Sequence, residues 1–198
     1  LPNAAKEADA VRNLAEGFGE RVEVRHSCTA AELRELLASL RPRIFLFIGY
    51  ADEIDPVTGQ LTFAFTDAAG GIQLVDPATI IDILSSAPTL ELIVLSGNKS
   101  ATLGEAVARR GVPVVCWQTL AEDSAAAYFS TALFSYLWNL GNAGTTLRRL
   151  LRPALEQAKL AITTVHRADG KGALFAIDDP DKYHGADGKP HGNLTDGS

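Results

Sequence analysis

Residues 44–51 read Ile-Phe-Leu-Phe-Ile-Gly-Tyr-Ala, in which five large apolar side chains are followed by a glycine turn. Residues 90–100, Leu-Glu-Leu-Ile-Val-Leu-Ser-Gly-Asn-Lys-Ser, contain a shorter apolar run at 92–95 that also leads into a glycine turn. An unbroken apolar run of this length is typical of a central parallel strand that is covered on both faces. Two such strands ending in glycine turns predict an α/β fold with polar side chains, Tyr50 and Asn98, at the carboxyl edge of its sheet.

Helices and short strands alternate around these two runs. Apolar residues at helical spacing predict helices over 3–16, 29–40, 76–85 and 100–110, and further strands are expected at 22–24 and 112–117. Thr29 and Asp76 stand where they can cap their helices, and Pro77 fits a first helical turn. This alternation predicts a three-layer sandwich with a mainly parallel central sheet and helices on both faces.

The remaining segments give the domain organisation. Residues 61–65 and 72–74 flank a glycine-rich turn and predict a hairpin outside the main sheet. Two longer helices are expected at 121–139 and 145–165, and a last short strand at 173–177. After Asp178 the sequence is mostly Asp, Gly, Lys, His and Pro. We therefore expect one domain over residues 1–178 and a flexible polar tail over residues 179–198.

Composition argues against several classes of partner. The chain of 198 residues has a net charge of −6 and a pI near 5.2. Nucleic acids and anionic membranes require clustered Lys and Arg, so neither is expected as a partner. No apolar run reaches the roughly 20 residues of a membrane span. Cys28 and Cys116 lack partners at ligand spacing, so no metal site is expected and a reduced, cytoplasmic compartment fits best. The absence of Met suggests a piece of a longer protein.

The landmarks of the chain resemble those of the CHAT domains, a branch of the caspase-like peptidases. In that family the first of these strands ends in a Gly-His-Gly turn and the second in an Ala-Cys-x-Ser turn, which match residues 49–51 and 97–100. The opening residues 1–4 with Glu7, the segment 111–115, and the order Asp123, Phe129, Tyr136, Leu137 and Gly141 also follow the family. The resemblance covers roughly residues 1–177 and implies a caspase-like fold. It also implies a helical-repeat segment in the same polypeptide.

The chain departs from the family at the chemistry. Tyr50 stands where the family has histidine, Ala51 where it has the second glycine, and Asn98 where it has cysteine. A phenol with a pKa of roughly 10 does not act as a base near neutral pH. An amide is neither a base nor a nucleophile. The resemblance therefore implies a site without the catalytic pair of a cysteine peptidase.

The carboxyl edge of the sheet remains the expected binding region. Ligands of open parallel sheets sit outside the carboxyl ends of the strands, so we expect a cleft lined by Tyr50, Asn98, Lys99, Cys116 and Gln118. The resemblance adds Asp123, near the place where related peptidases hold a basic side chain of the substrate. A surface position near a helix N-terminus is the other interpretation of Asp123.

The turn at residues 97–100 also invites comparison with a phosphate-binding loop. It lacks the longer glycine-framed loop and the adjacent Gly-Lys-Ser that such loops need. We therefore expect Asn98 or Ser100 to cap the following helix instead.

These observations favour a catalytically inactive caspase-like domain that binds a protein or peptide, or acts as a scaffold, and uses no cofactor. Two alternatives stay open. One is an active cysteine peptidase in which Cys116, at the end of the third strand, reaches the cleft, although most buried cysteines act as small apolar residues. The other is a small-molecule-binding sensor domain of flavodoxin-like architecture.

Overall fold

The computed structural model describes residues 4–51, 53–54, 57, 59, 61–67, 69–118, 123–141, 145–168 and 194–197. The chain divides into two compact units. The first unit contains Leu1–Val24 and Thr119–Leu194, and the second contains Arg25–Gln118 and Thr195–Ser198.

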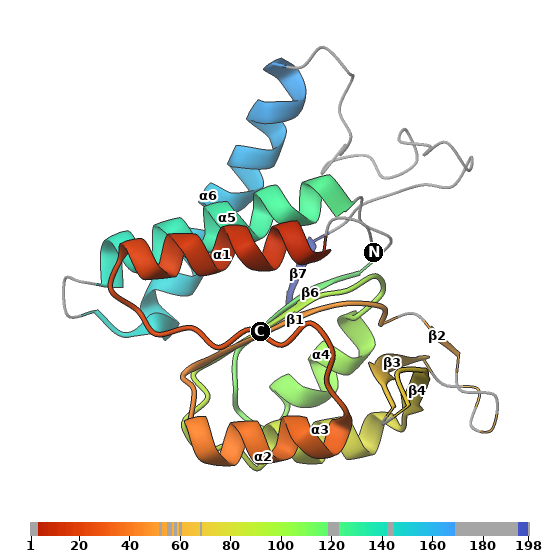
Figure 1. Ribbon diagram of the computed structural model, residues 1–198. Helices are drawn as coiled ribbons and strands as arrows, with labels where there is room; N and C mark the ends of the chain where they lie inside the picture. The colour runs from red at the N-terminus through yellow and green to blue at the C-terminus, as the bar shows by residue number, and fades with distance from the viewer. Residues whose placement is uncertain are drawn as a thin grey trace. The chain divides into compact units, whose positions relative to one another are not determined.

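A mainly parallel sheet forms the centre of the second unit (Figure 1). β1 runs parallel to β5, with Ile44 opposite Leu92 and Ile48 opposite Ser96, and β5 runs parallel to β6. The expected α/β fold class with a mainly parallel sheet is confirmed. The strands are ordered β1 (Ile44–Ile48), β5 (Leu92–Ser96), β6 (Val114–Trp117) and β7 (Leu194–Gly197).

The helices of the second unit begin where the sequence predicts. They are α2 (Ala30–Leu40), α3 (Pro77–Ser85) and α4 (Ala101–Ala108), which lie together on one side of the sheet (Figure 1). Thr29 accepts a hydrogen bond from the N–H of Glu32, whose carboxylate accepts one from the N–H of Thr29, so a capping box starts α2. Asp76 caps α3 by accepting from the N–H of Thr79. Both predicted caps are confirmed.

The core of the second unit lies between these helices and one face of the sheet. Ile93 and Leu95 of β5 are buried there together with Val114 and Cys116 of β6. On the opposite face of β5, Leu92, Val94 and Ser96 are buried as well, so every residue of this strand is buried. β5 is therefore a central strand, as its apolar run predicts.

Among the described residues β1 is an edge strand, which differs from the prediction that it is central. It stands at the end of the strand order, and all of its residues are only half-buried. Phe45 and Phe47 pack against the core, so this strand needs its large apolar side chains although one of its edges carries no strand among the described residues. An apolar run indicates that both faces of a strand are covered, but it does not distinguish an edge strand from a central one.

Two other expectations differ from the structure. Residues 20–25 have no regular secondary structure, although a strand was expected at 22–24. Three alternating residues are too few to define a strand without a pairing partner. Leu194–Gly197 forms β7 beside β6, within the segment that we predicted as a flexible tail. That prediction weighed side-chain burial alone, whereas backbone groups are what join a strand to a sheet. The strand expected at 173–177 lies outside the described residues.

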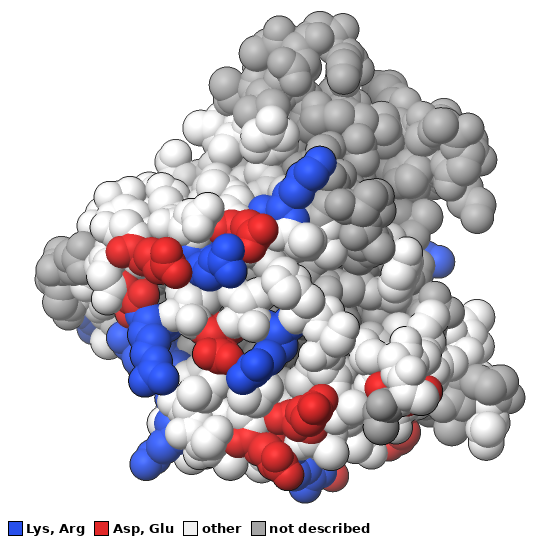
Figure 2. Space-filling model, viewed as in Figure 1, with Lys and Arg blue, Asp and Glu red and all other residues white. Residues whose placement is uncertain are grey.

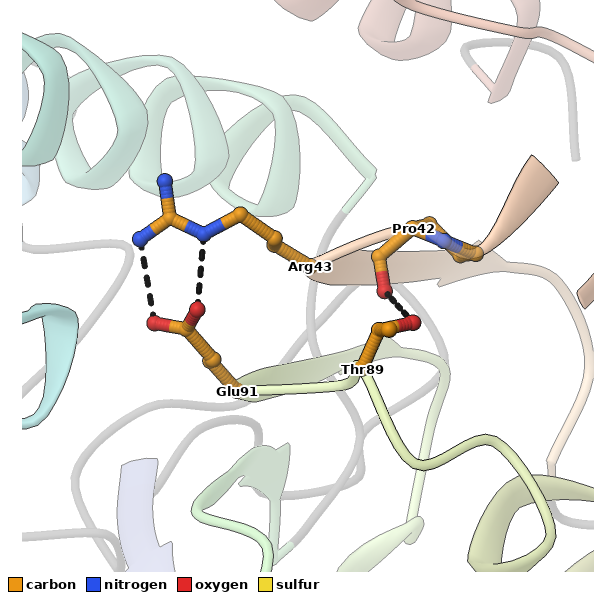
Figure 3. A network of polar contacts seen from close by, with 4 residues as sticks. All are labelled: Pro42, Arg43, Thr89 and Glu91. Atoms are coloured by element: carbon orange, nitrogen blue, oxygen red, sulfur yellow. Dashed lines mark hydrogen bonds and ion pairs between the residues drawn. The ribbon is translucent and has the colours of Figure 1, made fainter.

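Polar contacts join β1 to β5 at their amino ends (Figure 3). The guanidinium of Arg43 pairs with both carboxylate oxygens of Glu91, through Nε at 2.7 Å and Nη2 at 3.0 Å. The hydroxyl of Thr89 donates to the carbonyl of Pro42 at 2.9 Å. The carbonyl of Arg43 accepts from the N–H groups of Glu91 and Leu92. These contacts hold the pair of strands at the end opposite to the predicted site.

A small antiparallel sheet packs against β1. It contains β2 (Glu53–Ile54), β3 (Leu61–Thr66) and β4 (Ile72–Val75), so the hairpin expected outside the main sheet is confirmed. The ring of Phe63 in β3 stacks on Phe47 of β1, with 4.3 Å between the ring centroids. The chain thus leaves β1 at Gly49 and turns at once into a region held by aromatic packing.

The helices of the first unit pack on one another. α1 (Ala4–Gly17) and α6 (Leu147–Ala168) both contact α5 (Asp123–Gly141). The carboxylate of Glu7 is buried in α1 and accepts a hydrogen bond of 2.5 Å from the hydroxyl of Ser130 in α5. Among the described residues, no helix has the length and apolar character needed to cross a membrane.

Candidate functional site

The turns that follow β1 and β5 lie against each other. A Cβ atom on Gly97 would stand 2.8 Å from the carbonyl oxygen of Gly49 and 2.9 Å from Cβ of Ala51. The N–H of Gly49 donates to the carbonyl of Ser96 at 3.3 Å. Because side chains do not tolerate such short approaches, the missing side chain of Gly97 allows the two turns to meet. The structure therefore brings together the turns that carry Tyr50 and Asn98.

Gly49 is fixed by the aromatic cluster beneath it. A Cβ atom on Gly49 would lie 2.6 Å from the tip of the Phe47 ring. That ring is stacked on Phe63 and also contacts Phe65, so it has little room to move. Any side chain at position 49 would disturb the base of the β1 turn.

Ser100 ties the ends of β5 and β6 together. Its buried hydroxyl donates to the carbonyl of Leu95 and accepts from the N–H of Trp117, both at 3.1 Å. Ser100 makes no side-chain cap to α4, so the expectation that Ser100 caps this helix is wrong. The partner residues lie five and seventeen positions away along the chain, and a sequence pattern does not reveal that bridge.

Lys99 adopts a left-handed backbone conformation, with φ of 51°. For residues other than glycine this region costs about 1–2 kcal/mol, because Cβ approaches the following carbonyl oxygen. Strain of this kind is concentrated at functional sites, where the surrounding structure maintains it. The strained turn leaves the Lys99 side chain exposed.

Polar side chains reach the surface at this edge. Tyr50 is 42% exposed, while its backbone carbonyl accepts from the N–H of Ala64 at 3.1 Å. Asn98 is half-buried, and Gln118, directly after β6, is exposed. Phenol and amide groups both donate and accept hydrogen bonds near neutral pH. Four predicted cleft residues, Tyr50, Asn98, Lys99 and Gln118, thus lie at the ends of the strands with some side-chain surface accessible.

Ser96 is a polar residue of this edge that the sequence interpretation missed. It ends β5 and is 5% exposed, and its Oγ has no hydrogen-bond partner among the described residues. The signal for it is a polar residue closing an otherwise apolar run. A buried hydroxyl left without a partner costs about 1–3 kcal/mol, so the carboxyl end of β5 holds unused hydrogen-bonding capacity.

Cys116 lies in the core and not in the predicted cleft. It is 1% exposed, and a Cβ atom on Gly104 of α4 would stand 2.7 Å from its Sγ atom. The sulfur therefore occupies the space between β6 and α4. A nucleophilic thiol must be reachable by its substrate, so this position suits packing and not catalysis.

The prediction for Asp123 stays untested. It begins α5 and belongs to the first unit, and its side chain lies outside the part of the chain that the structure describes.

Neither the surface charge nor a comparison with known proteins identifies a ligand for this site. On the face drawn in Figure 2, Lys and Arg side chains alternate with Asp and Glu, and no basic field is visible among the coloured residues. Within the described ranges, no cluster of three or more His, Cys, Asp or Glu residues could hold a metal ion. A comparison with models of known families and a comparison with curated proteins both gave no match.

Proposed function

We propose that the chain is a catalytically inactive caspase-like domain of CHAT type that binds an extended segment of a partner protein at the carboxyl edge of its sheet. The contact of Gly97 with Gly49 and Ala51 carries this proposal. It makes neighbours of the two turns in which the family has its histidine and cysteine. With Tyr50 and Asn98 there, the site offers hydrogen bonds without a thiol and a base.

An exchange of one methyl group between the turns supports the alignment with the family. The family has alanine before its cysteine and glycine after its histidine, whereas this chain has Gly97 and Ala51. In the structure, Cβ of Ala51 lies 2.9 Å from the point where a Cβ of Gly97 would be. The exchange thus conserves the total side-chain volume across the contact, although a Cβ at position 97 also requires the carbonyl of Gly49, at 2.8 Å, to shift.

The open edge of β1 supports an extended peptide as the ligand. Its residues are half-buried, and one side of the strand pairs with no strand among the described residues. Unpaired N–H and C=O groups of an edge strand can add a strand from another chain. A peptide paired with β1 would meet the exposed phenol of Tyr50 beyond the carboxyl end of the strand, where the backbone carbonyl of Tyr50 is already bonded to Ala64 of β3.

The setting proposed for this domain follows from the same resemblance. Its partners are proteins or peptides, and a helical-repeat segment of the same polypeptide could present them. A cytoplasmic location accords with Cys28 and Cys116, neither of which is in a disulfide. The competing peptidase that uses Cys116 loses support, because that thiol is buried under α4.

Cleavage of a diverse peptide library, read by mass spectrometry, tests the proposal. We expect no cleavage by the natural chain. A variant with Tyr50→His and Asn98→Cys restores the reactive groups, and adding Ala51→Gly with Gly97→Ala restores the methyl position of the family. We expect cleavage from the variant with all four changes.

Two results would contradict the proposal. Cleavage by the natural chain that disappears in Cys116→Ala would move the nucleophile to Cys116. A folded four-position variant with no activity would count against a peptidase-like arrangement of the two turns.

A further inference from the structure

An open cavity of about 370 Å³ lies along α2, apart from the residues of the candidate site. Its size is in the range of sites that hold small ligands or single side chains. We call it the α2 pocket, and all of its lining residues belong to the second unit. They are Arg25, Ser27, Cys28, Glu32, Glu35, Leu36 and Ser39.

The charges in the wall of the α2 pocket favour a cation. Glu32 is held ionised, since the backbone hydrogen bond from Thr29, then that residue's hydroxyl, and then the charge of Arg25 lower its pKa. Arg25 is thus already close to one carboxylate. Glu35 is exposed on the same helix as Glu32 and adds a second carboxylate to the wall. The wall therefore carries one negative charge more than it carries positive charges.

The other lining residues suit the stem of a long side chain. Leu36 provides an apolar surface next to Glu32 and Glu35 on the same helix. Lys and Arg side chains lay their methylene groups along apolar surface and keep the charged end among polar groups. The hydroxyls of Ser27 and Ser39, which also line the pocket, supply further acceptors.

We propose that the α2 pocket binds a basic side chain, arginine or lysine, presented by a peptide. The aliphatic stem lies against Leu36, and the cation lies between the carboxylates of Glu32 and Glu35. This site goes beyond the function proposed above, because it shares no residue with the turns that carry Tyr50 and Asn98. The two proposals can therefore fail independently.

A titration of the isotope-labelled chain with N-acetyl-arginine amide, followed by amide chemical shifts, tests this site. We expect saturable shifts at residues 25–28 and 32–39. N-acetyl-glutamine amide, which is neutral, should bind at least about threefold more weakly, as expected for loss of a partly exposed ion pair. Glu35→Gln should weaken binding of the arginine probe by a similar factor. Glu35 takes no part in the capping box of α2, so this variant keeps the fold.

The control variant is Glu105→Gln, which removes an exposed carboxylate from α4, outside the pocket. It should bind the arginine probe as the natural chain does. Equal binding of the neutral probe, or an unchanged affinity in Glu35→Gln, would overturn the proposal. Tighter binding of N-acetyl-glutamate amide would also overturn it, because Arg25 would then select an anion. Binding of free arginine but not of the blocked probe would show a small-molecule site instead of a peptide site.

Discussion

The two ends of the β1–β5 pair are held in different ways. At the amino end, the exposed pair of Arg43 and Glu91 joins the strands through long side chains at the surface (Figure 3). At the carboxyl end, glycine allows two backbones to touch, and the buried hydroxyl of Ser100 links β5 to β6. Surface ion pairs tolerate replacement, whereas backbone contacts and buried bridges do not. The carboxyl end thus has the rigidity that a binding site requires.

The largest effect is expected from Ser100→Ala. The change leaves the buried carbonyl of Leu95 and N–H of Trp117 without their partner, so we expect a loss of about 3 kcal/mol in the free energy of unfolding. The matched change at the amino end is Thr89→Ala, which removes one partly buried hydrogen bond and should cost about 1 kcal/mol. Urea denaturation of both variants measures the difference. If Thr89→Ala costs as much as Ser100→Ala, the proposed contrast between the ends is wrong.

Gly97→Ala should give the next largest loss, about 2 kcal/mol, because its Cβ would overlap the carbonyl of Gly49 and the methyl group of Ala51. Combining it with Ala51→Gly removes one of these overlaps. We therefore expect the double variant to be more stable than the sum of the single changes predicts. If the changes in the free energy of unfolding were strictly additive in this double-mutant cycle, residues 51 and 97 would not be in steric contact.

Lys99→Gly should stabilise the protein by about 0.5–1 kcal/mol. Glycine adopts a positive φ without the steric cost that lysine has at 51°. The larger conformational entropy that glycine gives to the unfolded chain offsets part of this gain. Lys99→Ala is the control, since it removes the same charge and keeps Cβ. Thermal unfolding of both variants should show a gain for glycine alone, and an equal gain for alanine would assign the effect to charge.

The smallest effect is expected at the amino end, from Glu91→Gln. The side-chain hydrogen bonds from Arg43 lower the pKa of Glu91 below its ordinary value of 4.5, against the opposing effect of burial. The pair therefore stabilises the fold above pH 4.5, and this contribution disappears as the pH falls through the folded-state pKa. Because both side chains are largely exposed, we expect less than about 1 kcal/mol at pH 7. The free energies of unfolding of the natural chain and of Glu91→Gln should converge once the pH lies below the folded-state pKa of Glu91, and a difference that stays constant with pH would contradict this assignment.

Sequence reasoning predicted those parts of the fold that local chemistry determines. The cap residues Thr29 and Asp76 allowed the starts of their helices to be predicted. Each cap is a hydrogen bond between a side chain and an N–H group only three positions further along the chain. The edge position of β1 was not predictable, because Phe45 and Phe47 face the core whether or not another strand lies alongside. Strand order depends on distant pairing, which an apolar pattern does not encode.

The candidate site shows the same division. Tyr50 and Asn98 follow strands that were recognised, so their place at one edge of the sheet could be predicted. The bridge made by Ser100 and the short approach of Gly97 to Gly49 join separate segments and became visible only in three dimensions. Cys116 was misplaced because the face of a short strand cannot be assigned from the sequence when all of its residues are apolar.

Retention of intact peptides tests the central claim most directly. A diverse peptide library is passed over the immobilised natural chain, and bound and released peptides are identified by mass spectrometry. We predict that uncleaved peptides without Arg or Lys, which the α2 pocket does not select, are retained and that Tyr50→Ala with Asn98→Ala abolishes their retention. The control, Tyr128→Ala with Asn139→Ala, removes an exposed tyrosine and asparagine from α5 and should leave retention unchanged. Retention that survives loss of Tyr50 and Asn98, or peptides released in pieces, would contradict the account.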